Sequence, residues 1–312
     1  MQSGMNRRSF LQWGAVAGAT AMTPQWMKAQ AAPAARPHSD TRDVPVKATK
    51  LYDNVYLLQG SGGNMALQTG PEGNLLIDSS FALAVPRIRE AIAAVSKDAP
   101  YFLINTHWHS DHTGGNEGLH AAGFTICAHQ MARERLSTPQ TMKLFHATLP
   151  PAPAGAWPTV TFESDLHLWH NGDALDLVHI APAHTDTDIY IHFHQAGVLH
   201  LGDTFFNGMY PVIDEGTGGS IGGMIRASEK SLALAGAGTK IIPGHGPLGS
   251  KSDLQKFHEM LSAIRDKVAA LKAAGASEQE AVAKNPTAEF DAAWGKGVMN
   301  KDMFAGIVYR TL

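Results

Sequence analysis

The segment from Asn105 to Asn116, NTHWHSDHTGGN, concentrates residue types that can bind a metal ion. Three histidines and one aspartate lie within six positions, from His107 to His112. Imidazole and carboxylate groups are the usual ligands of a borderline cation such as zinc. Residues i and i+2 of an extended segment point to the same side, so His107 and His109 can reach one point together. Two interpretations stay open here: ligands that converge on metal, or scattered polar residues on a surface loop.

Three later segments each place one further ligand candidate just after an apolar run. These candidates are His184 in APAHTD, Asp203 in LHLGDTFF and His245 in IIPGHGP. Loops on a rigid scaffold are where binding and catalytic residues are usually found. The pattern therefore allows the ends of several strands to meet at one rim that carries all the candidates.

The order and context of these residues resemble the ligand set of the metallo-β-lactamase superfamily, across about residues 51–267. The matching residues are His107, His109, Asp111, His112, His184, Asp203 and His245. The resemblance implies an α+β fold, an αββα sandwich of two mixed sheets with outer helices. It implies a first metal ion held by His107, His109 and His184, a second held by Asp111, His112 and His245, and a bridge between them formed by Asp203. It also implies that Asp78, at the end of LLIDSS, orients a ligand imidazole.

The resemblance implies a hydrolase with two zinc ions, for which other divalent metals such as iron or manganese are alternatives. A hydroxide between the two ions would open an amide or ester, with β-lactams and lactones as the leading substrate classes. Asp111 is expected to orient this hydroxide and to shuttle its proton. Tyr210, in the apolar segment DTFFNGMYP, is the candidate for a catalytic contact with substrate, while ordinary core packing is an equal alternative for that segment.

Two functions from other classes stay open beside this one. A mononuclear iron dioxygenase that acts on persulfides has a similar motif. A non-catalytic periplasmic accessory protein of a quinoprotein or sulfur-oxidation pathway is the other. The complete set of seven ligands disfavours both, and metal analysis together with a hydrolysis assay separates them.

Composition narrows the classes of partner. The chain has 312 residues, of which 44% are hydrophobic and 17% charged, and this is typical of a globular protein. The formal net charge of −3 and the lack of a basic run disfavour nucleic acid or an anionic membrane surface, so a small-molecule substrate is expected. The single cysteine, Cys127, excludes an internal disulfide. Its position within a predicted strand favours a small buried hydrophobe over a metal ligand.

The first residues resemble a twin-arginine export signal. The resemblance rests on Arg7, Arg8, Phe10 and Leu11 in NRRSFLQWG, and a small-x-small cleavage site ends at Ala31. It implies transport by the twin-arginine machinery, signal cleavage near Ala31 and a periplasmic location. No stable membrane anchor is expected, because the apolar run of residues 10–22 is too short and too rich in glycine to span a bilayer.

The chain therefore divides into a signal peptide (1–31), a flexible lead-in rich in alanine and proline (32–50) and a domain (51–312) with C-terminal helices from about residue 268. The apolar pattern of the domain predicts an antiparallel meander, a buried strand that leads into the first histidines, and alternating strands and helices after it. The predicted strands cover residues 54–60, 64–70, 73–80, 101–106, 123–129, 175–182, 188–194, 197–203 and 239–247. The predicted helices cover residues 85–96, 130–145, 222–236 and 253–275, followed by one or two short ones. Residues 149–164 read as a proline-rich loop able to cover a site. The remaining histidines, His167, His192 and His194 among them, are expected to be structural.

Overall fold

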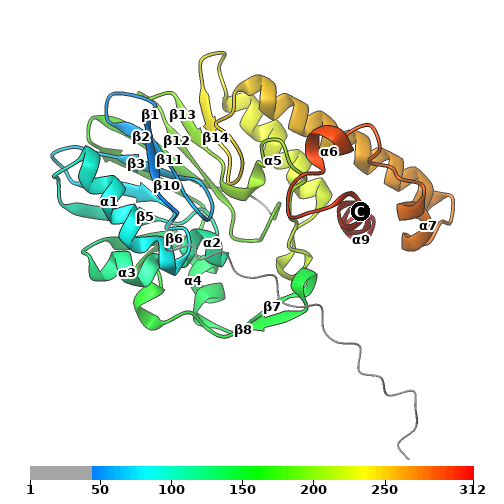
Figure 1. Ribbon diagram of the computed structural model, residues 1–312, viewed down its shortest axis with the longest axis horizontal. Coiled ribbons are helices and arrows are strands. Elements are labelled where there is room, and N and C mark those ends of the chain that lie inside the picture. Colours follow the sequence, from blue (N-terminus) through cyan, green and yellow to red (C-terminus); the bar gives the residue numbers. More distant parts are fainter. Residues whose placement is uncertain (1–43, 181) are drawn as a thin grey trace, which may run out of the picture. The chain divides into compact units, whose positions relative to one another are not determined.

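The computed structural model describes residues 44–180 and 182–312 (Figure 1). The predicted signal peptide and most of the predicted lead-in lie outside the described residues. The described residues all belong to one compact unit. None of the helices in the described ranges is both long and apolar enough to cross a membrane.

The first sheet has seven strands within the described residues. In spatial order they are β1 (Lys47–Lys50), β2 (Val55–Gln59), β3 (Met65–Gln68), β4 (Asn74–Ile77), β5 (Pro100–Ile104), β6 (Thr125–His129) and β9 (Val160–Phe162). Strands β1 to β4 pair antiparallel, which confirms the predicted meander. Strands β4, β5, β6 and β9 pair in parallel. Parallel neighbours end at the same edge of a sheet, so the residues after β4 and β5 lie side by side.

The second sheet contains five strands in the described part of the chain. In spatial order they are β10 (Asp165–His170), β11 (Asp173–His179), β12 (Ile189–Phe193), β13 (Val198–His200) and β14 (Lys240–Ile242). Only the pair β13 and β14 is parallel among them. The loops that follow these two strands therefore meet at one edge, where Phe206 and His245 form an isolated parallel bridge.

Helices cover the outer face of each sheet, as Figure 1 shows for α1 on one side and for α5 and α6 on the other. The α-helices of the described residues are α1 (Val85–Val95), α2 (Ser110–Thr113), α3 (Asn116–Ala121), α4 (Gln130–Ser137), α5 (Ile221–Leu234), α6 (Lys251–Ala273), α7 (Glu278–Ala283), α8 (Asp291–Trp294) and α9 (Lys301–Arg310). Helix α6 begins at a capping box formed by Ser250 and Asp253, and Gly275 follows its end with a φ of +87°. These layers confirm the predicted αββα sandwich.

Alternation along the strands produces the separate apolar layers, because successive side chains of a strand point to opposite faces. Leu75 and Ile77 of β4 pack between the two sheets together with Ile191 of the second sheet. Leu76, between them in sequence, packs outward against Ile88 of α1. A third apolar cluster joins the second sheet to α5, α6 and α9. The sheets are therefore fixed from both faces, which makes their edges a rigid support for loops.

The segment after α4 differs from the prediction of a helix over residues 130–145. Helix α4 ends at Ser137, and a hairpin of β7 (Gln140–Met142) and β8 (Ala147–Leu149) follows. Thr138 is extended because it precedes Pro139, whose ring disfavours a helical conformation in the residue before it. The proline therefore ends the helix and frees the next residues to pair as strands.

Three further strands were not predicted. Strand β9 lies inside the predicted proline-rich loop. Strand β1 lies inside the predicted lead-in. Val46 and Ala48 of this segment pack against the apolar cluster beneath α1, which holds it to the first sheet. Strand β10 follows the predicted proline-rich loop and pairs along its whole length with β11. Its sequence, DLHLWH, alternates apolar and polar residues, which is the pattern of a strand with one face in the core.

Candidate metal centre

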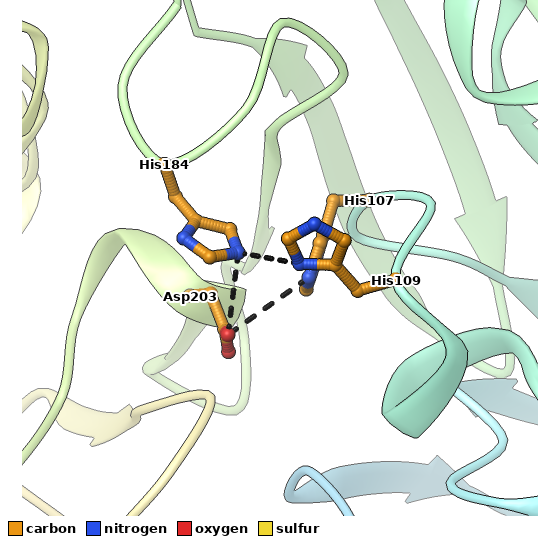
Figure 2. A group of neighbouring side chains, drawn as sticks. All are labelled: His107, His109, His184 and Asp203. Carbon is orange, nitrogen blue, oxygen red and sulfur yellow. Dashed lines mark hydrogen bonds and ion pairs between the residues drawn. The ribbon is translucent and has the colours of Figure 1, made fainter. Parts of the chain in front are cut away.

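Four of the predicted ligands form one group at the edge of the two sheets. His107 and His109 follow β5, His184 lies in the loop between β11 and β12, and Asp203 lies in the 3-10 helix η5 (Gly202–Thr204) after β13. One ligand atom from each lies within 4.8 Å of the others. Figure 2 shows the rings of His184 and His109 turned toward each other, with the Asp203 carboxylate beside them. The separations are 2.8 Å between His184 Nε2 and His109 Nδ1, and 3.4 Å between His184 Nε2 and Asp203 Oδ2.

The other three predicted ligands form a second group on the opposite side of Asp203. His245 Nε2 lies 3.1 Å from Asp111 Oδ2, and His112 Nε2 lies 3.1 Å from Asp203 Oδ1. His245 Nε2 is 3.5 Å from the same Asp203 oxygen. The two oxygens of Asp203 therefore face different groups: Oδ2 faces the first and Oδ1 the second. All seven residues predicted from the sequence meet at one place.

Hydrogen bonds on the far side of each ring fix which nitrogen faces the first group. His184 Nδ1 lies 2.7 Å from the carbonyl oxygen of Val212, and His109 Nε2 lies 3.2 Å from Asp214 Oδ2. Both partners can only accept, so each outer nitrogen carries the hydrogen and each inner nitrogen has a lone pair. Two lone pairs then face each other across 2.8 Å, an arrangement that a bound cation would stabilise.

The rings of His107 and His112 are oriented in the same way through Asp78. Its carboxylate accepts hydrogen bonds from the backbone nitrogen and the hydroxyl group of Thr106, at 2.8 and 2.7 Å, and lies 2.7 Å from His112 Nδ1. Thr106 Oγ1 is thereby left to accept from His107 Nδ1, at 3.0 Å. His107 Nε2 then carries a lone pair, and this atom is buried without a hydrogen-bond partner among the described residues. An orphaned buried acceptor of this kind fits a metal ligand.

The charge of the site also fits a cation. Burial would raise the pKa of Asp111, but His112 and His245 lower it to about 2. Burial opposes protonation of His245, yet Asp203 and Asp111 raise its pKa to about 9. Burial keeps the pKa of His184 low, at about 4, so that ring stays neutral. The carboxylates thus attract positive charge to the second group, and a divalent ion would compete with protons for the same nitrogens.

Two glycines are required by close approach to the ligands. A Cβ atom at Gly63 would overlap the ring of His112, and one at Gly244 would overlap Asp203 Oδ1. The ring of His112 is held by Asp78, and Gly244 also approaches the backbone of Gly202, so neither neighbour can simply move aside. The two loops that carry these glycines therefore close tightly over the second group.

A cavity of about 450 Å³ opens onto the site. His109, Asp111, His184, Asp203 and His245 form its polar floor. Its walls are mostly apolar and come from the segment after β4, the hairpin of β7 and β8, the segment after Asp203, and the loop before α9. The wall residues are Phe81, Met142, Ala147, Leu149, Phe206, Met209, Tyr210, Val212, Val298 and Met299. No lysine or arginine is among its lining residues in the described ranges. The predicted proline-rich cover is thus replaced by this hairpin, which contributes Met142, Ala147 and Leu149.

Tyr210 lines this cavity, but its hydroxyl group is already engaged. It donates to Asp291 Oδ1 at 2.9 Å and lies 3.3 Å from the carbonyl oxygen of Thr287. The ring stacks on Phe304 of α9, and burial together with Asp291 raises the pKa of Tyr210. The hydroxyl group therefore points toward the C-terminal helices, and a catalytic role of Tyr210 stays a prediction.

Sequence reasoning missed several residues that position the ligands. Asp214 orients His109 and also receives a hydrogen bond from Thr217 at 2.8 Å. Asp188 accepts hydrogen bonds from the backbone nitrogens of His184 and Thr185 at 2.7 and 2.9 Å and so shapes that loop. Asp188 follows the candidate ligand His184 by four residues, which was an available signal. Asp214 had no comparable signal in the sequence.

Comparison with known proteins agrees with this arrangement. The sequence model described as "Metallo-beta-lactamase superfamily" matches residues 54–250, and the model of the "TAT (twin-arginine translocation) pathway signal sequence" matches residues 4–24. No curated protein matches the chain.

Among solved structures, the chain is similar to a metallo-beta-lactamase from Pontibacter korlensis, with 18% identity and a TM-score of 0.57 over 70% of this chain and 99% of that one. It is also similar to a double mutant of the sec-alkyl sulfatase PisA1, with 17% identity and a TM-score of 0.66. A third is the stereoselective inverting sec-alkylsulfatase Pisa1 from Pseudomonas sp., with 16% identity and a TM-score of 0.63. The match covers 85% of this chain in both cases but only 50% of the sulfatase chain. At these identities the likeness concerns the fold.

Proposed function

Because the chain belongs to the metallo-beta-lactamase superfamily, we propose that it is a hydrolase with two metal ions that opens an amide or ester bond in a small, largely apolar substrate. The observation that carries this proposal is the position of Asp203, whose two oxygens face two separate groups of imidazoles. A single metal ion would leave one of these groups without a cation.

The proposed ligand assignment follows the two groups. The first ion would be held by His107, His109 and His184 and the second by Asp111, His112 and His245, and Asp203 would contribute one oxygen to each group. Zinc is the proposed ion, since imidazole and carboxylate ligands without thiolate suit it, and iron or manganese are the alternatives.

When bound, such a pair of ions would lower the pKa of water toward neutrality, so that a hydroxide is available as the nucleophile, and would polarise the substrate oxygen. The chain's own contribution begins with Asp111, whose side chain is 26% exposed and lines the cavity. Its lowered pKa keeps it ionised, so it can accept a proton from the attacking water and pass it to the leaving group. The apolar walls exclude other water from this exchange.

The cavity supports an uncharged acyl substrate. Its lining holds apolar side chains above the polar floor and, within the described residues, no lysine or arginine to bind a phosphate or a peripheral carboxylate. Lactones fit this description fully. Penicillins and cephalosporins fit it through their strained ring but also carry a carboxylate, for which this lining has no lysine or arginine. A strained ring that opens on attack needs less further stabilisation of the oxyanion. A sulfate ester of a secondary alcohol is the second candidate, since the apolar wall would also accept an alkyl chain. The sulfate ester is placed second because the cavity lining, within the described residues, has no cationic side chain for the sulfate group.

Export across the cytoplasmic membrane, indicated by the twin-arginine signal, is consistent with a substrate that arrives from outside. We propose that the mature protein begins after Ala31 and acts in the periplasm. Since the twin-arginine route carries folded proteins, the ions would be loaded before export.

The test is kcat/KM for the zinc-loaded protein on a cephalosporin, a penicillin, an acyl-homoserine lactone, an aryl ester, a sec-alkyl sulfate and an aryl phosphodiester. We expect chelator-sensitive turnover, fastest on a lactone or β-lactam. Asp203→Ala should lower kcat by more than about a hundredfold, because a metal ion supplies several kcal/mol of transition-state stabilisation. Asp165→Ala, a matched change of an exposed aspartate on β10, should leave kcat unchanged.

Fastest turnover of the sulfate ester would favour the second candidate. Fastest turnover of the phosphodiester would contradict the acyl assignment. No turnover of any compound would favour a non-catalytic accessory protein, and persulfide oxidation with one iron per chain would favour the dioxygenase.

A further inference from the structure

A second cluster of metal-binding side chains lies on the second sheet, on the face opposite the core between the sheets. The strand register places His167 of β10 opposite Asp176 of β11, and Asp176 opposite His192 of β12. Directly paired residues project from the same face of a sheet. The sequence neighbours of Asp176 and His192 point into the core between the sheets: Leu175, Leu177 and Ile191. The row of His167, Asp176 and His192 therefore points away from that core.

His194 extends the row, because it lies two residues after His192 and therefore on the same face. Its Nε2 is 2.8 Å from Asp176 Oδ2, and its ring centroid is 4.3 Å from that of His192. On the other side of the carboxylate, His167 Nδ1 is 2.6 Å from Asp176 Oδ1. One ligand atom each from Asp176, His192 and His194 lies within 4.8 Å of the others.

The cluster is independent of the proposed dinuclear centre. Strand β12 runs away from the loop of His184, so His194 lies at the opposite end of the strand. The side chain of His167 is 70% exposed and that of His194 is 45% exposed. An ion from solution can therefore reach the cluster directly.

The ring of His192 is available to bind a metal ion. His192 makes no hydrogen bond through its ring with any residue that the structure describes, and its contact there is with the ring of His194. Neither ring nitrogen of His192 is therefore engaged by these residues, and one of them can present a lone pair to an ion. A neutral imidazole beside an ionised carboxylate and a second imidazole is a ligand set for a borderline divalent cation.

We propose that Asp176, His192 and His194 bind one divalent transition-metal ion of the zinc, nickel or copper class. The ion would take the place of the hydrogen bond between His194 and Asp176, while His167 orients the carboxylate through its other oxygen. Three protein ligands leave a coordination position open to water. Rigid strands on both sides keep the ligands in register, so little side-chain ordering is needed on binding.

Trp169 provides a natural reporter for this site. It lies on β10 opposite Ala174, on the same face and two residues from His167, and 80% of its surface is exposed. His194 donates its backbone N–H to the carbonyl oxygen of Ala174 on the intervening strand. Two strand spacings separate Trp169 from His194, which is about 10 Å. Paramagnetic Ni²⁺ or Cu²⁺ bound at this distance should quench the fluorescence of Trp169.

The experiment is a Ni²⁺ titration of the full protein whose buried centre has first been filled with zinc, followed by tryptophan fluorescence and by metal analysis after dialysis. We expect one Ni²⁺ per chain in addition to the retained zinc, and quenching that Trp169→Phe removes. His192→Ala and His194→Ala should each weaken Ni²⁺ binding by at least about tenfold, since losing a ligand costs no less than losing an outer partner. The affinity order should place Cu²⁺ above both Ni²⁺ and Zn²⁺.

Asp165→Asn is the matched control, because Asp165 is an exposed carboxylate on the same face of β10 but outside the ligand group. It should leave the Ni²⁺ affinity within about twofold of that of the wild type. Losing a group that orients a ligand lowers metal affinity by about 10- to 100-fold. Equal Ni²⁺ binding by wild type and His194→Ala would overturn the proposal, and so would Ni²⁺ uptake matched by an equal loss of zinc. This result does not depend on hydrolysis, so the surface site and the proposed function can fail separately.

Discussion

Asp78 holds the ring of His112 through a contact of 2.7 Å between Asp78 Oδ2 and His112 Nδ1, and it does so from a left-handed backbone with a φ of 63°. A residue other than glycine in this region is strained by about 1–3 kcal/mol and persists only where its surroundings fix it. The hydrogen bonds from Thr106 and the backbone link from Asp78 N to the Ile104 carbonyl oxygen supply that fixation. The junction after β4 and β5 therefore sets the ligand directions for both proposed ions.

Replacing Asp78 should weaken binding at the second proposed ion more than it unfolds the protein. Asp78→Ala should lower the affinity for that ion by about 10- to 100-fold, the usual effect of losing the partner that orients a ligand imidazole. Asp78→Asn should cost less, because its amide oxygen can still accept from His112. Chelator competition with calorimetry as a fold check measures both. Equal affinities for Asp78→Ala and the wild type would contradict the assigned role.

Asp214 should act in the same way on the first proposed ion. Asp214→Ala removes the acceptor of His109 Nε2, so the ring loses the partner that fixes its tautomer. We expect kcat and the affinity for the first ion to fall by about 10- to 100-fold. Glu215→Ala is the matched control, because that neighbouring carboxylate pairs with Arg310 away from the ligands. A similar loss in both variants would show a general effect of charge or folding.

Tyr210→Phe separates a structural role from a catalytic one. The hydroxyl group donates to the Asp291 carboxylate, so its loss should lower the free energy of unfolding by about 1.5–3 kcal/mol, the range for a hydrogen bond to a charged group. The value of kcat should stay within about twofold, because the hydroxyl group does not stabilise an oxyanion in this account. A fall in kcat of a hundredfold or more, typical of losing an oxyanion donor, would restore Tyr210 as a catalytic group.

The layers, and the meeting of the seven candidate ligands at one place, could be predicted from the sequence because each leaves a local signal. Leu75, Leu76 and Ile77 alternate between two apolar layers, and His107 and His109 follow a strand at the spacing that turns both to one side. The positioning residues leave weaker signals. Asp214 reaches His109 across a sequence separation of 105 residues, and no local pattern distinguishes it from an ordinary loop aspartate.

The same limit applies to the surface cluster and to the orientation of the Tyr210 hydroxyl group. His167, Asp176 and His192 become neighbours only through the register of three strands, and for one of these, β10, the sequence analysis predicted no strand. Tyr210 could be placed near the site from its position after Asp203, but the direction of its hydroxyl group depends on Asp291, far along the chain.

The export prediction concerns residues that the structure does not describe. Changing Arg7→Lys and Arg8→Lys together should keep the protein uncleaved in the cytoplasm, because the paired arginines are read by a receptor and a conserved charge does not replace them. Cell fractionation with an antibody measures the distribution, and the unchanged chain is the control. Normal periplasmic accumulation of the double variant would indicate general secretion instead.

The central claim, two metal ions held around Asp203, is tested most directly by the metal-to-protein ratio. The ratio should be measured by elemental analysis on the His194→Ala variant, so that the proposed surface site does not contribute. We predict two zinc ions per chain, and fewer than two with loss of chelator-sensitive hydrolysis in Asp203→Ala. One tightly bound iron per chain, with no second ion even after zinc is added, would contradict the account.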